Sequence, residues 1–445
     1  MPTAIGLVFI TLGMFLFIRQ DESLFGLLVF SSIFAAASIF QGGSHGVQPF
    51  FAVGLLYCIQ CFLRGRYFQK RTYRYKGSMV ALAFGAFAIC TAFTLPFIFA
   101  GTPVYDPYVG IDQGLLNRPP LHFALANVTQ SFYILLDILI LFGAAIGGRH
   151  FHSVRRAYLF TFYFLCALVF VQFAFGMLRV PFPYSLFQNH AGYGMQRAQL
   201  ASWRSRFPGT FSESSYAGVV IAGFTSGFLA QQLRRGGALF PSALGLLTII
   251  LVRSSASLVA IGIVIFSLLV RNPIFRLPNL IDRAQLRRSA LILCLLAAAV
   301  GAVLLSPLTA SIQTLTVGKD NTASYKDRHA ADLYALELVK VTKGLGVGMG
   351  SNRPSSLITS LLSTTGVVGT CLFLSSLFLL FRNAQGEDEW LRWAGGSLLL
   401  GMALAIPDYF WPPLWIFGAL AVQSRFQSAI RKREIPRPEH LALSK

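Results

Sequence analysis

Charged residues, and acids above all, are scarce in this chain. Only 12% of its 445 residues are charged, with 17 acids against 37 lysines and arginines, whereas 55% are hydrophobic and the mean hydropathy is +0.61. A soluble protein of this length would need a more polar surface, so lipid is the expected solvent. Unbroken apolar runs, without period-two alternation, exclude a transmembrane β-barrel. We therefore predict an all-α polytopic membrane protein in which residues 1–445 form a single integral membrane domain.

Cysteine is scarce as well, which excludes a disulfide framework. All six cysteines fall inside apolar segments, where they are expected to be small packing residues. Cys58 and Cys61 have the spacing of a redox pair, but no charged residue lies beside them in their apolar segment. A signal-peptide cleavage pattern is missing too, so the first apolar segment is expected to stay in the membrane.

About 12 or 13 segments have the hydropathy to cross a membrane, although the shorter ones are less secure. The predicted spans are residues 3–18, 24–40, 47–63, 78–100, 126–147, 157–178, 215–230, 238–252, 255–270, 289–306, 357–381, 393–406 and 412–423.

The distribution of basic residues predicts how these spans are oriented in the membrane. About two thirds of the 37 cations lie on one side, notably in residues 64–76, in residues 271–288 and in the tail from Arg425, and the positive-inside rule makes this side cytoplasmic. The N-terminus is then outside. The outer face receives residues 101–125, residues 179–214, residues 307–356 and the Pro407–Pro413 turn. Nearly all outer cations lie in the two long loops, 179–214 and 307–356, so we expect an anion to be bound there.

The cytoplasmic loops lack the parts of a nucleotide- or metal-dependent enzyme. They contain no glycine-rich phosphate cradle, no paired carboxylates and no metal-ligand spacing, which excludes an ATP-driven or nucleotide-sugar reaction on that face. Contact with anionic membrane lipids is their expected role. We expect no cofactor, no metal site and no nucleic-acid partner.

The first long loop ends in a carboxylate surrounded by arginines. Glu213 lies where the next helix is expected to begin, so its carboxylate is either a helix-capping charge or a functional group that Arg206 neutralises. Arg197 and Arg204 stand in the same stretch. Because like charges repel, the crowding of these arginines favours a bound anion.

The second long loop combines a helix with a glycine run. Arg328 and His329 open a predicted helix whose apolar residues Leu333, Leu336, Leu338 and Val339 are spaced to lie along the membrane surface. Alternating glycines then precede the next span, followed by Arg353. Such glycines serve either as a flexible turn or as a backbone that reaches positive φ and forms an anion nest. The glycines in question are Gly346, Gly348 and Gly350.

Three isolated charges have open interpretations. Arg253 lies between two spans and either snorkels to the interface or contributes a phosphate ligand. Asp137, in mid-span, is either protonated, paired across helices or directed into a cavity. Asp408 stands among aromatic residues, so an interfacial belt role is expected.

Three motifs in this order resemble the O-antigen polymerase and ligase superfamily. The stretch Gly209–Ala217 is similar to its G-x-F-x-E-x-S-x-A pattern, and Ser324–Arg328 to its S-x-x-x-R. Gly346–Gly350 followed by Gly366–Gly369 resembles its G-x-G-x-G and G-x-x-G. The likeness covers about residues 200–370 by motif and the rest by hydropathy alone.

This resemblance implies a glycosyltransferase of the bacterial inner membrane that polymerises polyprenyl-diphosphate-linked repeat units on the periplasmic face. It implies catalytic roles for Glu213, Arg328 and His329, and possible partner proteins of the flippase and chain-length-regulator classes. The diphosphate would be held by Arg204, Arg206, Arg253, Arg328, Arg353, Gly346, Gly348 and Gly350.

Two alternatives remain. The ligase branch places a histidine after the glycine run, and no histidine lies between Gly350 and Gly369, so a polymerase fits better than a ligase. A flippase or transporter should show two similar halves, and no internal repeat is evident. A non-catalytic scaffold is a further rival.

Overall fold

The computed structural model describes residues 1–42, 45–68, 75–105, 118–145, 151–190, 206–235, 239–271, 323–382, 384 and 388–434. Thirteen α-helices lie within these ranges, which confirms the predicted all-α membrane fold. Strands β1 (Gln41–Gly42) and β2 (His45–Gly46) form one small antiparallel pair.

The helices follow the predicted spans closely. They are α1 (Ala4–Ile18), α2 (Ser23–Ser31), α3 (Pro49–Leu63), α4 (Lys76–Ile98), α6 (Leu125–Ala144), α7 (Phe151–Leu178), α9 (Ser214–Arg235), α10 (Leu239–Val252), α11 (Ser255–Arg271), α14 (Ala323–Val341), α15 (Leu357–Arg382), α16 (Glu389–Ala405) and α17 (Pro412–Glu434). Single 3-10 turns are η1 (Arg66–Phe68) and η4 (Tyr184–Leu186). The predicted span 289–306 lies outside the described residues.

Four of these helices are long and apolar enough to cross a membrane. They are α4, α6, residues Val154–Leu178 of α7, and α15, and shorter apolar helices are α1, α3, α10 and α11. Membrane character is therefore established. The count of 12 or 13 crossings stays a prediction.

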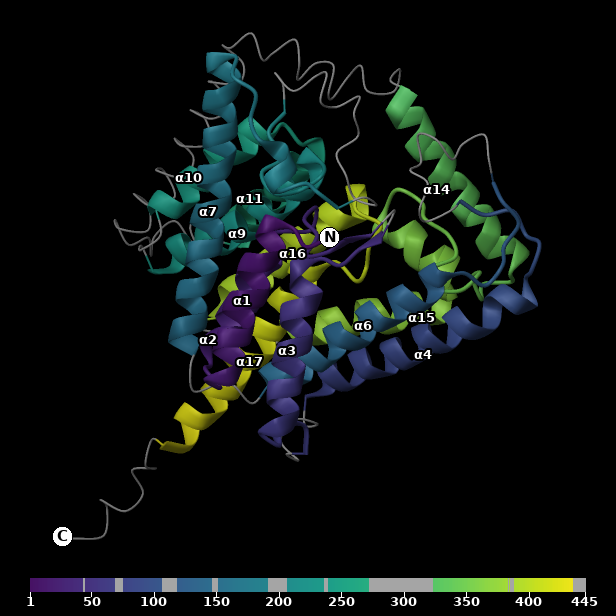
Figure 1. Cartoon of the computed structure of the whole chain (residues 1–445), viewed down its shortest axis with the longest axis horizontal. Helices are drawn as coiled ribbons and strands as arrows, with labels where there is room; N and C mark the ends of the chain where they lie inside the picture. The colour runs from purple at the N-terminus through teal and green to yellow at the C-terminus, as the bar shows by residue number, and fades with distance from the viewer. Residues whose placement is uncertain are drawn as a thin grey trace, which may run out of the picture.

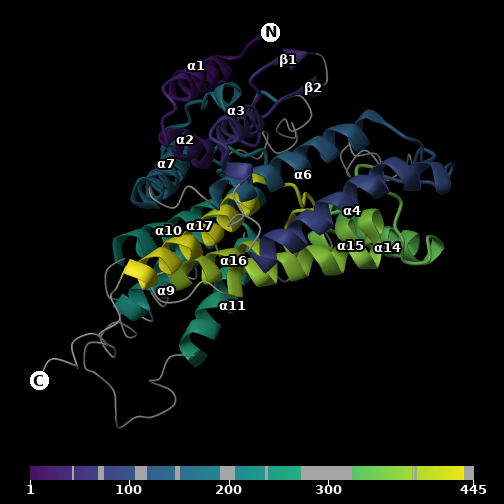
Figure 2. The same cartoon turned by 90° about the horizontal axis from the view of Figure 1, so that it is seen from below.

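Helix α9 lies at the centre of one half of the molecule. It packs against α16, α10 and α11, while α4 packs against α15 and α6 in the other half (Figures 1 and 2). Small residues allow the close contacts of α9, since a Cβ at Gly223 would lie 2.8 Å from the Leu398 side chain. Helix α14 packs on α15 at the end of the α4–α15 pair (Figure 2).

Helix α2 is shorter than the predicted span 24–40, because it ends at Ser31. The backbone beyond it is held by the first long loop: the Thr210 hydroxyl donates to the carbonyl of Ile33, and the His190 N–H donates to the carbonyl of Ala36 at 3.0 Å. Non-helical backbone at membrane depth is tolerated where protein covers it or where it lines a cavity. The end of α2 at Ser31 therefore places non-helical backbone where it can line a cavity.

Three of the four stretches predicted for the outer face are joined by hydrogen bonds and an ion pair, and Glu213 joins residues 179–214 to them. The backbone N–H of Tyr105 donates to the side chain of Asn352 at 3.0 Å, and the Tyr334 hydroxyl donates to the carbonyl of Pro103 at 2.7 Å. The Arg353–Asp408 ion pair joins the second long loop to the Pro407–Pro413 turn. The side of the membrane on which they lie stays a prediction.

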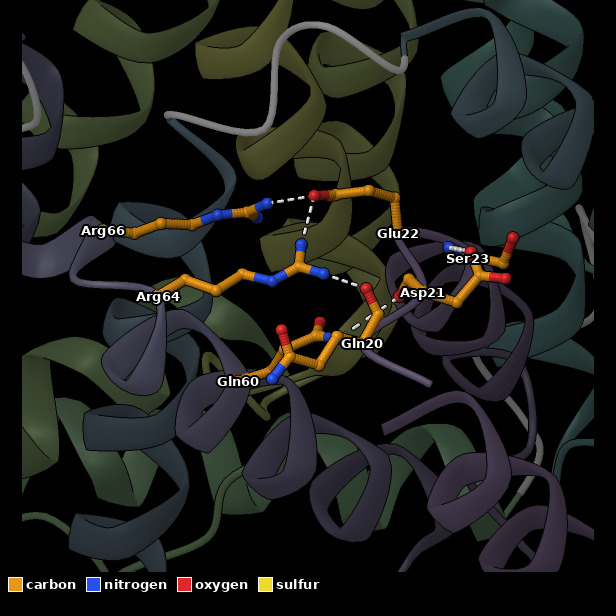
Figure 3. Close-up of polar contacts among 7 residues, drawn as sticks. All are labelled: Gln20, Asp21, Glu22, Ser23, Gln60, Arg64 and Arg66. Carbon is orange, nitrogen blue, oxygen red and sulfur yellow. Dashed lines mark hydrogen bonds and ion pairs between the residues drawn. The ribbon is translucent and has the colours of Figure 1, made fainter. Parts of the chain in front are cut away.

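Segments predicted for the cytoplasmic face also meet. One carboxylate oxygen of Glu22, in the turn between α1 and α2, accepts from both Arg64 and Arg66 at the end of α3 (Figure 3). Arg64 also donates to the carbonyl of Gln20 (Figure 3). One acid therefore anchors the start of the basic 64–76 segment, whose residues 69–74 lie outside the described ranges.

Candidate functional site

The two long loops meet at an ion pair between Glu213 and Arg328. The Arg328 guanidinium donates to the Glu213 carboxylate at 3.1 Å, and the Ser215 hydroxyl donates to the same oxygen at 3.1 Å. Glu213 immediately precedes α9, where the N-terminal N–H groups favour a negative charge. Sequence reasoning named Arg206 as the group that neutralises Glu213, but the ion-pair partner is Arg328.

Arg206 lies within electrostatic reach of this pair, and Arg253 lies within electrostatic reach of Arg206. Arg206 is exposed at the surface. Partial desolvation by the surrounding protein and the charge of Arg328 nevertheless lower the pKa of its guanidinium, whereas the charge of Glu213 raises it. Arg253 lies between α10 and α11, and its pKa is lowered by partial burial and by the charge of Arg206. We call Glu213, Arg206, Arg253 and Arg328 the arginine cluster.

Within its own four side chains, the arginine cluster has more cations than acids. Three guanidinium groups accompany one carboxylate within these four side chains. Placing cations near one another in a partly desolvated setting is unfavourable unless an anion joins them. Arginine is also the side chain best suited to phosphate, because its planar fork can donate two parallel hydrogen bonds. The cluster can therefore bind a phosphate or diphosphate group.

A second ion pair contacts α9 through Tyr216, in the first turn of this helix. Arg353 donates to the carboxylate of Asp408 at 3.1 Å, and the Tyr216 hydroxyl donates to the same oxygen at 3.1 Å. Glu213 lies just before the first turn of α9 and Tyr216 lies within that turn, so both ion pairs contact the start of this helix. Asp408 is only 7% exposed, so the expected belt role is wrong. Its carboxylate balances Arg353 instead.

Asp332 ties α14 to the start of α15. Its carboxylate accepts from the backbone N–H of Ser355 at 2.8 Å, from the Ser355 hydroxyl at 2.6 Å and from the Thr359 hydroxyl at 2.8 Å. Asp332 lies one helical turn after Arg328, and Ser355 lies two residues after Arg353. This clasp therefore fixes the two arginine-bearing segments relative to each other.

The glycine run adopts the left-handed backbone that was predicted, with φ of +80° at Gly346, +100° at Gly348 and +84° at Gly350. However, these glycines lie close to other parts of the protein and not around an open anion site. The N–H of Gly346 donates to the Thr342 hydroxyl at 3.0 Å, and that of Gly348 donates to the carbonyl of Thr364 at 2.9 Å. Two donors of the expected anion nest are therefore already engaged.

The glycines instead allow close packing of the loop between helices. A Cβ would lie 2.7 Å from the Thr364 carbonyl oxygen at Gly346, 2.8 Å from that of Thr91 at Gly348, and 2.7 Å from that of Ala126 at Gly350. The loop fits into a kink of α15, where Gly366 has a φ of +67° and the Val367 N–H donates to the carbonyl of Gly344 at 2.9 Å. These glycines position Arg353 through packing.

Helix α14 has apolar residues facing both the protein and outward, and its place along the membrane surface stays a prediction. Leu338 is buried, whereas Leu333 and Leu336 are 53% and 40% exposed. The buried side is completed by Ala331 and Ala335, at helical spacing from Leu338. His329 is exposed, and adjacent helical residues point about 100° apart, so it does not share the direction of Arg328. Arg197 and Arg204 lie outside the described residues.

A small hollow adjoins the second ion pair. Aromatic side chains line it together with Ala35, Gln48, Ser212 and Asp408. Its interior volume is about 10 Å³, which is room for about one water molecule or one hydroxyl group. Ala35 belongs to the non-helical segment after α2, so the break in that helix contributes to the wall. The aromatic lining residues are Phe211, Tyr216, Phe410 and Trp411.

One charged position lies apart from the arginine cluster. Asp137 in α6 is fully buried, and within the described part of the chain neither of its carboxylate oxygens has a hydrogen-bond partner. Pairing across helices is therefore not observed there.

Among the described residues, no group of three or more histidines, cysteines, aspartates or glutamates is placed to hold a metal ion.

Sequence reasoning missed the roles of Tyr216, Asp332 and Asp408. The usable signal was the scarcity of acids, since an acid in a predicted outer loop of so basic a chain is a strong candidate partner for an arginine. Tyr216 carried no such signal beyond its place in the motif that begins at Gly209. The clasp of Asp332 depends on a hydroxyl and an N–H that only the folded chain brings together.

No family model matches this chain, and no curated protein matches it either.

Proposed function

We propose that this protein polymerises polyprenyl-diphosphate-linked oligosaccharide repeat units on the periplasmic face of a bacterial inner membrane. The observation that supports this most is the arginine cluster, in which three guanidinium groups accompany the carboxylate of Glu213. A cationic excess at the edge of a membrane protein suits a lipid-linked diphosphate. The adjacent carboxylate suits a hydroxyl that must be oriented for attack.

In the proposed reaction, a sugar hydroxyl of one lipid-linked unit attacks the reducing-end anomeric carbon of another lipid-linked glycan. A new glycosidic bond forms, the bond between that carbon and the diphosphate oxygen breaks, and the electron pair leaves with the lipid diphosphate. Glu213 accepts or orients the hydroxyl proton. Arg206, Arg253 and Arg328 stabilise the charge that develops on the leaving oxygen.

Arg353 has a separate part in this proposal. Its charge is balanced by the buried carboxylate of Asp408, so it contributes less to the cationic excess than the arginines of the cluster. We assign Arg353 to holding the second loop against α9. Gly346, Gly348 and Gly350 serve the same end by close packing.

The test is elongation of lipid-linked repeat units by the purified protein without nucleotide or divalent metal. Arg328→Ala is expected to lower the rate about 10²- to 10³-fold, the usual cost of removing one donor that stabilises a developing charge. Lys340→Ala is the matched control, because Lys340 is an exposed cation on the same helix. Elongation that proceeds equally in Arg328→Ala would contradict the proposal.

Deletion of the gene separates the alternatives in cells. Accumulation of single lipid-linked repeat units supports a polymerase. Full-length lipid-linked chains would indicate a ligase. Repeat units that stay on the cytoplasmic leaflet would indicate a flippase.

A further inference from the structure

Two of the residues that line the hollow beside the second ion pair each have an unsatisfied polar atom. Gln48 and Trp411 both line it, and they are 5% and 3% exposed. Within the described residues, the Gln48 side-chain carbonyl oxygen Oε1 and the Trp411 indole nitrogen Nε1 are buried without a hydrogen-bond partner. Folded proteins rarely leave buried polar atoms unpaired, so two of them around one hollow point to a ligand that completes them.

The chemistry of these two groups defines that ligand. An indole N–H acts only as a hydrogen-bond donor, and an amide oxygen acts only as an acceptor. A hydroxyl group does both at once. Aromatic walls complete the environment: the Trp411 ring lies 6.1 Å from the Phe211 ring and 5.7 Å from the Tyr216 ring, measured between centroids. Aromatic surface beside paired donors and acceptors is suited to a sugar, which has apolar C–H faces and hydroxyl edges.

We propose that this hollow is a subsite that receives one hydroxyl-bearing edge of a sugar in the acceptor glycan. The acceptor is favoured because Ser212 lines the hollow and Glu213, the carboxylate assigned to the attacking hydroxyl, follows directly in the chain. Tyr216, which also lines the hollow, lies one turn beyond Glu213. The assignment to the acceptor rests on the proposed function, whereas sugar binding in the hollow can be measured independently of it.

Two variants remove the polar groups while keeping the shape. Trp411→Phe deletes the N–H and retains an aromatic ring, and Gln48→Met deletes the amide and retains its length. Matched controls are Trp393→Phe, at a half-buried tryptophan away from the hollow, and Gln60→Met, where a glutamine also has a buried unpaired oxygen but lines no part of the hollow. Thermal unfolding in detergent verifies that each variant is folded.

The first measurement is elongation at varied concentrations of the lipid-linked repeat unit. Each hollow variant is expected to raise KM about five- to tenfold with a smaller change in kcat, as for the loss of one hydrogen bond to a bound hydroxyl. The controls should leave KM unchanged. A KM that is unchanged in both hollow variants overturns the proposal. A lower thermal stability with an unchanged KM would mean that the hollow holds only water.

The second measurement uses the oligosaccharide released from the lipid-linked pool by mild acid. It should quench tryptophan fluorescence of the wild-type protein, and Gln48→Met should weaken that binding. If the wild-type protein fails to elongate lipid-linked units but binds this oligosaccharide in a Gln48-dependent way, the polymerase assignment fails and the sugar subsite stands. No binding, or equal binding by the wild-type and Gln48→Met proteins, overturns the subsite.

Discussion

Neutralising Glu213 and removing Arg328 should have opposite effects on the binding of inorganic pyrophosphate. Both variants break the same ion pair of 3.1 Å. Glu213→Gln leaves three guanidinium groups without their carboxylate, so a bound anion is attracted more strongly. Arg328→Ala removes one of the three cations, so a bound anion is attracted less. A salt bridge with a purely structural role would make the two variants behave alike.

The magnitude follows from Coulomb's law. A unit charge about 6 Å from an anion contributes about 0.7 kcal/mol at the dielectric constant of water and about 2.8 kcal/mol at an effective value near 20. The Arg328 and Glu213 side chains are 36% and 23% exposed, which favours the lower end. We therefore expect Glu213→Gln to tighten pyrophosphate binding about three- to tenfold and Arg328→Ala to weaken it by a similar factor.

Titration calorimetry or thermal shift in detergent measures these affinities, at about 0.1 M and about 1 M salt. The Debye length falls from about 10 Å to about 3 Å over this range, so both effects should shrink at high salt. Glu213→Gln should nevertheless lose elongation activity, which separates anion binding from the positioning of the acceptor hydroxyl. Shifts of equal sign in the two variants, or no shift in either, would refute the electrostatic role of the cluster.

Three further variants test other parts of the fold by thermal unfolding. Gly348→Ala should destabilise the protein by about 2 kcal/mol or more, because φ is +100° and the new Cβ would lie 2.8 Å from a backbone oxygen; Gly262→Ala, with open space around it, should not. Glu22→Gln should cost about 1 to 3 kcal/mol, since two arginines lose their shared carboxylate, and an unchanged midpoint would contradict this. Asp137→Asn should not lower the unfolding midpoint, because a neutral amide avoids burying an unpaired charge. A lower midpoint would reveal a cation partner of Asp137.

Hydropathy predicted the positions of most helices because burial in lipid and burial in protein both select apolar residues. The predicted span 357–381, for example, corresponds to α15 at Leu357–Arg382. Hydropathy could not predict the end of α2 at Ser31. The residues that follow are as apolar as the helix, and their backbone groups are satisfied by Thr210 and His190, which lie far away in the chain.

The sequence predicted which cations lie at the site, but not which acid pairs with each of them. Net charge and topology indicate that Arg206, Arg328 and Arg353 lie on one face, yet neither says which acid each will meet. The glycine run illustrates the same limit. Its positive φ values followed from residue type, whereas its engagement with Thr342 and Thr364 depends on how the loop enters the kink of α15.

The two ion pairs at the start of α9 have different roles in the proposed site. Arg353 meets a carboxylate that is 7% exposed and is further held by Tyr216, so an incoming anion would have to compete with an established buried pair. Arg328 meets a more exposed carboxylate and has Arg206 within electrostatic reach, so an anion there relieves repulsion. A diphosphate should therefore bind at Arg328, leaving the Asp408 side of α9 to the uncharged part of the substrate, which is where the aromatic hollow lies.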